Sequence, residues 1–94
     1  MTNATATNEE IREQEYQEAY KALTADVKRA ITQSIDHDEK VEVSIDESIL
    51  DIWDALRIVC DCSDDYDTAR ENDGSEDVWG MVEGEDFRLN LYTS

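Results

Sequence analysis

The residues best suited to chemistry in this sequence are one histidine, two cysteines and a large excess of carboxylates. His37 is the only histidine and lies in the charged segment "DHDEK", where a solvated side chain is far more common than a general base. Carboxylate pairs that could transfer protons occur throughout the chain, so their presence does not single out a site. No glycine-rich phosphate loop or nucleophile elbow is present. We therefore expect a protein that is not an enzyme.

The same residues give little support to a metal site. Cys60 and Cys62 could offer two thiolates, but a structural zinc site usually needs four ligands. Two small apolar side chains on one face of a strand are the more common arrangement. The acidic segment "ENDGSED" fails as an EF-hand, because ligand positions counted from Gly74 fall on Ala69 and Gly80. We expect no cofactor and no structural metal. Loose binding of a cation by this acidic segment is the one metal interaction that remains an alternative.

The charge of the chain is strongly negative and unevenly distributed. The formal net charge is −17. Residues 1–40 carry nine acids against five lysines and arginines, whereas residues 41–94 carry sixteen acids against three arginines and no lysine. Such a field repels nucleic acid and anionic membranes, and it accelerates association with a basic surface. The expected partner is a basic protein, and neither nucleic acid nor a membrane is expected to bind directly.

The length and the cysteine content of the chain limit how many domains it can form and where it can fold. Its 94 residues suit one domain, which we expect over residues 8–94 after a disordered tail at residues 1–7. No apolar run approaches the roughly 20 residues of a membrane helix, and the N-terminus lacks the pattern of a signal peptide. Two cysteines cannot form the disulfide framework of a small secreted domain. We expect a cytoplasmic protein.

The first element predicted in the chain is a long helix over residues 8–35. Thr7 and Glu10 have the spacing of a capping box. The helix would span roughly 40 Å, which is longer than so small a domain can cover. We therefore expect one of three arrangements. Part of the helix projects from the domain, or it pairs with a partner and so supports an oligomer, or the helix breaks near Thr24. Its apolar residues recur mostly at steps of three and four: Ile11, Tyr16, Tyr20, Leu23, Val27, Ile31 and Ile35.

A strand and a short helix are expected next. The segment "VEVSI" alternates apolar and polar side chains, which predicts a half-buried strand over residues 41–45. Ser48 and Asp51 then have the spacing of a second capping box. One apolar face of a helix is predicted by the spacing of four residues: Ile49, Ile52, Trp53 and Leu56.

Three further strands complete the expected fold. "RIVCDC" is β-favouring and is predicted as a strand with both cysteines on one face, followed by an acidic loop over residues 63–77. "VWGMV" and "FRLNLY" predict two more strands, joined by "EGED" with Gly84 in the turn. This order predicts an α+β domain with a long N-terminal helix and a mostly antiparallel sheet of about four strands.

Carboxylates on the short helix suggest DNA mimicry. Glu47, Asp51 and Asp54 stand four and three residues apart, so they fall on one face of the helix. Like charges at this spacing cost a few tenths of a kcal/mol, which a partner's cations would offset. Duplex DNA presents about one charge per 1.7 Å of axis, and a ridge of carboxylates can take its place in a basic groove. Four acids could extend the ridge: Asp61, Asp64, Asp65 and Asp67.

The segment "KVEVSIDESILDIWDALRI" resembles the uracil-DNA glycosylase inhibitor family of phages and mobile elements. In that family a strand runs into a Glu-Ser-Ile segment and a short acidic helix, and Glu47, Ser48 and Ile49 match this motif. The resemblance implies that this edge enters the enzyme's DNA-binding cleft, inside the host cytoplasm if a phage encodes the chain. It also implies an apolar pocket, between helix and sheet, for the leucine that the enzyme would otherwise insert into the duplex.

The ridge of carboxylates and the resemblance to glycosylase inhibitors together define two sets of candidate site residues. The expected partner-binding residues are Asp46, Glu47, Ser48, Ile49, Asp51, Asp54, Asp61, Asp64 and Asp65. The expected pocket-lining residues are Ile49, Ile52, Leu56, Val59 and Met81.

Two other functions stay open at this point. An antagonist of a CRISPR or restriction complex would use the same carboxylates without the pocket. An interaction or scaffold module adapted to high salt would also carry excess acids and few lysines, and would use the long helix to oligomerise. The uneven charge argues against the second function, because adaptation to salt should give the N-terminal helix as large an excess of acids as the rest of the chain.

Overall fold

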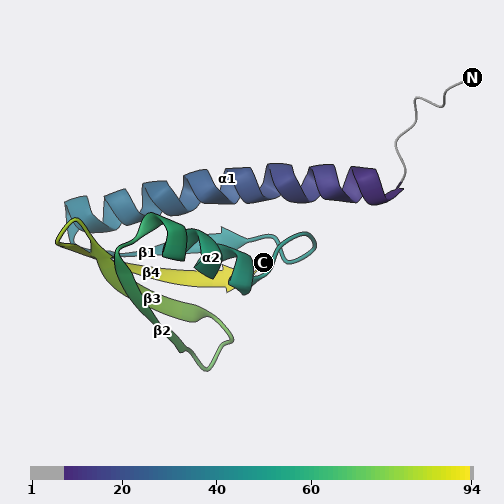
Figure 1. Cartoon of the computed structure of the whole chain (residues 1–94). Coiled ribbons are helices and arrows are strands. Elements are labelled where there is room, and N and C mark those ends of the chain that lie inside the picture. The colour runs from purple at the N-terminus through teal and green to yellow at the C-terminus, as the bar shows by residue number, and fades with distance from the viewer. Residues whose placement is uncertain (1–7, 94) are drawn as a thin grey trace, which may run out of the picture.

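The computed structural model describes residues 8–93, which form two helices and one four-stranded sheet. Both helices pack on one face of the sheet and leave its other face uncovered (Figure 1). The expected α+β fold, with its long first helix, is confirmed. In chain order the elements are α1 (Asn8–His37), β1 (Lys40–Ile45), α2 (Ile52–Cys62), β2 (Asp65–Arg70), β3 (Glu76–Val82) and β4 (Glu85–Thr93).

The sheet is mixed, with strand order β1-β4-β3-β2. β4 pairs with β3 and β3 with β2 in antiparallel fashion, as expected for most of the sheet, whereas β1 pairs with β4 in parallel. β1 and β2 are therefore the two edges. The parallel pair is possible because α2, β2 and β3 all intervene between β1 and β4 and form a long crossover.

The core lies between the sheet and the two helices. Strands β1 and β4 alternate between buried and solvent-facing residues, as expected of strands that face the core on one side only. In register, Val41 lies beside Leu89 and Val43 beside Leu91, so the buried residues form continuous rows. The side chains most fully enclosed in this core are Val27, Ile45, Ile58, Val59, Val78, Phe87, Leu89 and Leu91.

Helix α1 is longer than the layer that it covers. Its 30 residues span about 45 Å, and its N-terminal half extends beyond the sheet in Figure 1. Residues 9–15 are all exposed, and packing against the core begins at Tyr16. The prediction that part of the helix projects is confirmed, and no break occurs near Thr24. The predicted tail and Thr7, half of the predicted capping box, lie outside the described residues.

Helix α2 continues through the segment that was predicted to be a strand, so that prediction is wrong. Residues 57–62 complete the helix, which buries Ala55, Leu56, Ile58 and Val59 against the sheet. Burial of this apolar stripe outweighs the β-preference of single residues such as Ile58. Cys60 and Cys62 therefore do not share a face of a strand: Cys60 is exposed in the last turn of α2, and Cys62 is half-buried.

The predicted acidic loop over residues 63–77 is also wrong, because β2 forms within it. "DYDTAR" contains few apolar residues, and only Tyr66 and Thr68 are partly buried. Its strand conformation comes from backbone pairing with β3, in which Tyr66 lies opposite Gly80. Only residues 71–75 remain as a turn, closed by the amide of Gly74, which donates to the carbonyl of Glu71 at 3.0 Å.

The hairpin between β3 and β4 is confirmed. Two residues, Glu83 and Gly84, connect the strands, and both have positive φ, at 52° and 82°. A two-residue hairpin with two positive φ angles is a type I′ turn, whose twist matches that of the strands. Glycine adopts this angle without a steric penalty, which explains its position in "EGED".

Candidate functional site

The residues predicted to bind a partner do not form one ridge. Asp46 follows the C-terminal end of β1, which lies beside the C-terminal end of β4. Asp65 belongs instead to the opposite end of the sheet, because its partner Met81 pairs with Asp86 near the start of β4. Asp61 is exposed at the end of α2. The predicted acids therefore occupy two ends of the molecule, separated by the length of β4.

The Glu-Ser-Ile segment forms a tight exposed turn after the edge strand β1. Asp46 organises it: its Oδ1 accepts hydrogen bonds from the Ser48 hydroxyl at 2.6 Å and the Ser48 amide at 3.1 Å. These bonds lower the pKa of Asp46, so it stays charged. Leu50 closes the turn and is buried, whereas Glu47 and Ile49 face solvent. The turn thus presents Glu47, Ser48 and Ile49 outward, with Leu50 as its anchor.

Asp51 and Asp54 both serve the fold, and Asp54 is buried, so its assignment to an exposed ridge is wrong, whereas Asp51 is exposed as predicted. Asp51, not Ser48, caps α2: the Asp54 amide donates to its Oδ1 at 3.0 Å, and the Asp51 amide donates to Asp54 Oδ2 at 3.0 Å. The hydroxyl of Tyr16 donates to Asp54 Oδ1 at 2.6 Å. This bond, more than burial, raises the pKa of Tyr16. Asp54 is buried, with both carboxylate oxygens occupied.

The predicted apolar pocket does not form. Leu56 and Val59 are buried in the core, and Ile52 packs against it. Ile49 lies in the exposed turn, and Met81 lies on the uncovered face of the sheet. The five residues therefore do not surround a common cavity, because α2 packs Leu56 and Val59 into the core, and Trp53, predicted on the same apolar face, is 69% exposed instead.

Replacing Leu56 with alanine tests this correction. Because Leu56 is only 8% exposed, the truncation should lower the free energy of unfolding by about 2 to 5 kcal/mol. Urea unfolding of the wild-type and variant proteins would measure the loss. A variant that unfolds at the wild-type urea concentration would show that the side chain lines an open pocket after all.

The uncovered face of the sheet carries several acids, with Lys40 and Arg88 on the same side. Five carboxylates, which we call the acidic face, share this side by strand alternation and register: Glu42, Asp65, Asp67, Asp77 and Asp86. Two large apolar side chains stand among them, Trp79 at 44% and Met81 at 42% exposure. A hollow of about 280 Å³ lies here, lined by residues of β2, β3 and β4.

Register places three of these acids and one arginine directly around the apolar pair. Met81 lies between Asp65 on β2 and Asp86 on β4. Trp79 lies between Asp67 on β2 and Arg88 on β4. An apolar patch rimmed by charged residues is typical of a surface that binds another protein. Here three acids and one arginine form the rim, so its net charge is negative and the surface is complementary to a basic partner.

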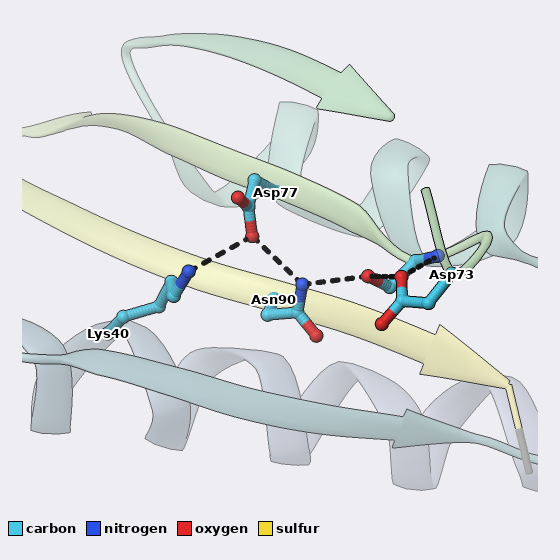
Figure 2. Close-up of polar contacts among 5 residues, drawn as sticks. Lys40, Asp73, Asp77 and Asn90 are labelled. Carbon is cyan, nitrogen blue, oxygen red and sulfur yellow. Dashed lines mark hydrogen bonds and ion pairs between the residues drawn. The ribbon is translucent and has the colours of Figure 1, made fainter. Parts of the chain in front are cut away.

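A chain of hydrogen bonds fixes the other end of the acidic face (Figure 2). The amide nitrogen of Asn90 donates to Asp77 Oδ1 at 2.8 Å and to the Ser75 hydroxyl at 3.1 Å. Ser75 in turn donates to Asp73 Oδ1 at 2.6 Å. The bond from Asn90 lowers the pKa of Asp77, and the bonds from Ser75 lower the pKa of Asp73. Both acids therefore stay ionised, although Lys40 Nζ, 3.4 Å from Asp77 Oδ1, offsets part of the charge.

Only part of this surface was predicted from the sequence. Asp65, Asp67 and Met81 were singled out, but for a helical ridge and a pocket. Trp79 and Asp86 were missed. The alternation in "VWGMV" places Trp79 and Met81 on one side and Val78 on the other, and this signal could have identified the apolar pair. The acids around it become neighbours only when β2 pairs with β3.

Residues 8–93 contain no group of three or more His, Cys, Asp or Glu side chains arranged to hold a metal ion. His37 is exposed in the last turn of α1. Within this range, neither helix combines the length and the apolar character needed to span a bilayer.

Comparison with known proteins identifies no relative. No protein-family model, no curated protein and no solved structure matches this chain.

Proposed function

We propose that this protein is a non-enzymatic DNA mimic that occupies the basic DNA-binding cleft of an enzyme, with uracil-DNA glycosylase as the leading target. The observation that carries the proposal is the acidic face, which no helix covers. Asp65 and Asp67, two residues apart on β2, are about 7 Å apart, and Asp65 and Asp86, on either side of Met81, are about 10 Å apart. The face therefore offers dense, fixed negative charge to a groove built for phosphates.

The apolar pair at the centre of the face supports a specific complex. Dense charge accelerates association, but buried apolar contacts slow dissociation. Trp79 and Met81 project from the sheet, so they would insert into the partner. The indole of Trp79, beside Asp67, would also attract a lysine or arginine of the partner.

The exposed turn after β1 supports the choice of target. The resemblance to glycosylase inhibitors implies that the Glu-Ser-Ile edge enters the enzyme's cleft. In this protein β1 is an edge strand, and it leads directly into the turn that presents Glu47 and Ser48. The turn and the acidic face would then contact the basic surface of the enzyme at two places.

A uracil-excision assay tests the proposal. We expect a stoichiometric amount of this protein to abolish glycosylase activity on uracil-containing DNA. Charge reversal at either contact, Glu47→Lys or Asp67→Lys, should weaken inhibition by about tenfold or more. Glu18→Lys is the matched control, since it makes the same charge change on an exposed part of α1. It should inhibit as the wild type does.

The other outcomes separate the alternatives. Full glycosylase activity beside this protein would rule out that target, and binding to a CRISPR or restriction complex at low salt would then assign another. A chain that binds no basic protein and unfolds below molar salt would overturn DNA mimicry and support a scaffold adapted to high salt. Equal effects of Glu18→Lys and Asp67→Lys would show that net charge alone is responsible.

A further inference from the structure

A second surface lies on the helical side of the molecule, away from the acidic face. A groove of about 680 Å³ lies along α1, and Arg57 is its lining residue from α2. Its wall is mostly apolar and includes Tyr16 and Tyr20, whose ring centroids are 5.9 Å apart. Sites for small molecules typically have volumes of about 300–1,000 Å³ and walls of this kind.

The rim of this groove is basic, in contrast to the rest of the protein. Lys21 and Lys28 of α1 and Arg57 of α2 line it, and none of its lining residues is acidic. All three side chains are exposed. Three of the eight lysines and arginines of the chain thus meet at one groove.

These three cations also differ from most other lysines and arginines of the chain in the ion pairs that they form. Among residues 8–93, Lys21, Lys28 and Arg57 have no acid within ion-pair distance, although the chain contains 25 acids. An apolar wall with uncompensated cations on its rim is complementary to an anion that has an apolar body. The cations that do lie at ion-pair distance from an acid are Arg29, Lys40, Arg70 and Arg88.

We infer that this groove binds an amphipathic organic anion, with an acidic head group at the cations and an aromatic or hydrocarbon body along the tyrosines. Lys21, Lys28 and Arg57 would hold the head group, and the rings of Tyr16 and Tyr20 would contact the body. A second copy of the chain is disfavoured as occupant, because it would bring a net charge of −17 toward a protein of the same charge. The inference does not depend on the proposed inhibition of a DNA-binding enzyme.

Titration of the full chain with two matched probes tests the inference. The anion 2-naphthoate and the neutral 2-naphthylmethanol have the same aromatic body, and nitrogen-15 NMR reports which amides each one shifts. We expect saturable shifts from naphthoate in residues 16–28 and around Arg57. The alcohol should bind at least about tenfold more weakly, since it makes no ion pair.

Charge-reversal variants identify the head-group site. Lys28→Glu and Arg57→Glu should each weaken naphthoate binding by about tenfold. Arg29→Glu is the matched control, because it makes the same charge change one residue away but pairs with Asp26 and does not line the groove. It should leave binding unchanged.

Three results would overturn the inference. Equal affinity for the alcohol would show that the cations do not select an anion. An effect of Arg29→Glu as large as that of Lys28→Glu would show that only net charge matters. A dimer in sedimentation that Lys28→Glu dissociates, together with no naphthoate binding, would assign the groove to a second copy of the chain.

Discussion

Gly80→Ala should lower the free energy of unfolding by about 3 kcal/mol, a large part of the roughly 5 to 15 kcal/mol that holds a small domain folded. A Cβ on Gly80 would lie 2.3 Å from the carbonyl oxygen of Asp65 and 2.8 Å from Cζ of Phe87. The first atom belongs to the backbone of β2, and the second to a ring that is 1% exposed. Neither can move without separating β2 from β3 or opening the core.

Urea unfolding followed by tryptophan fluorescence would measure the effect. Gly74→Ala is the matched control, because a Cβ there meets nothing within 4 Å and φ is +89°. Its cost should be that of backbone strain alone, about 1 kcal/mol. Equal losses for the two variants would contradict the close approach of Phe87 and β2 to Gly80.

Asp54→Ala should also lower the free energy of unfolding, by about 2 to 3 kcal/mol. The substitution removes one half of the capping box of α2 and also the acceptor of the Tyr16 hydroxyl. It thereby loosens the attachment of α1 to α2. Thermal and urea unfolding of the wild-type and variant proteins would give the difference.

Asp51→Ala separates the two roles of Asp54. Asp51 takes part in the capping box but makes no bond to Tyr16, so its replacement should cost only about 1 kcal/mol. In a double-mutant cycle, Tyr16→Phe and Asp54→Ala should be non-additive, because they remove the same hydrogen bond. Equal costs for Asp51→Ala and Asp54→Ala would show that the bond to Tyr16 contributes nothing to stability.

Asp54 shows how far a buried carboxylate differs from a surface one. Asp54 was predicted as part of a partner-binding ridge, because its spacing from Asp51 suits a helix face. Spacing gives the direction of a side chain on its own helix but not the element that lies opposite. Tyr16, which is 38 residues away in sequence, decides that Asp54 points inward.

Elements with a strong local signal were predictable from the sequence. The apolar period of α1, the alternation of β1 and the turn at Gly84 each depend on neighbouring residues, and each appears close to its expected position. The negative charge and its concentration in the second half of the chain are likewise properties of the sequence. Local periodicity and turn chemistry act over a few residues, so the sequence alone reveals them.

Tertiary contacts decided the rest. Residues 58–62 became helix because α2 buries Ile58 and Val59 against the sheet, and "DYDTAR" became a strand because β3 offered it a pairing edge. The parallel pairing of β1 with β4 and the acidic face both join residues that are far apart in the chain. By itself, the sequence determined a charged α+β chain with a long helix, because those features follow from local pattern and composition. Only the tertiary structure decided which acids point outward, because burial and strand pairing act between distant segments.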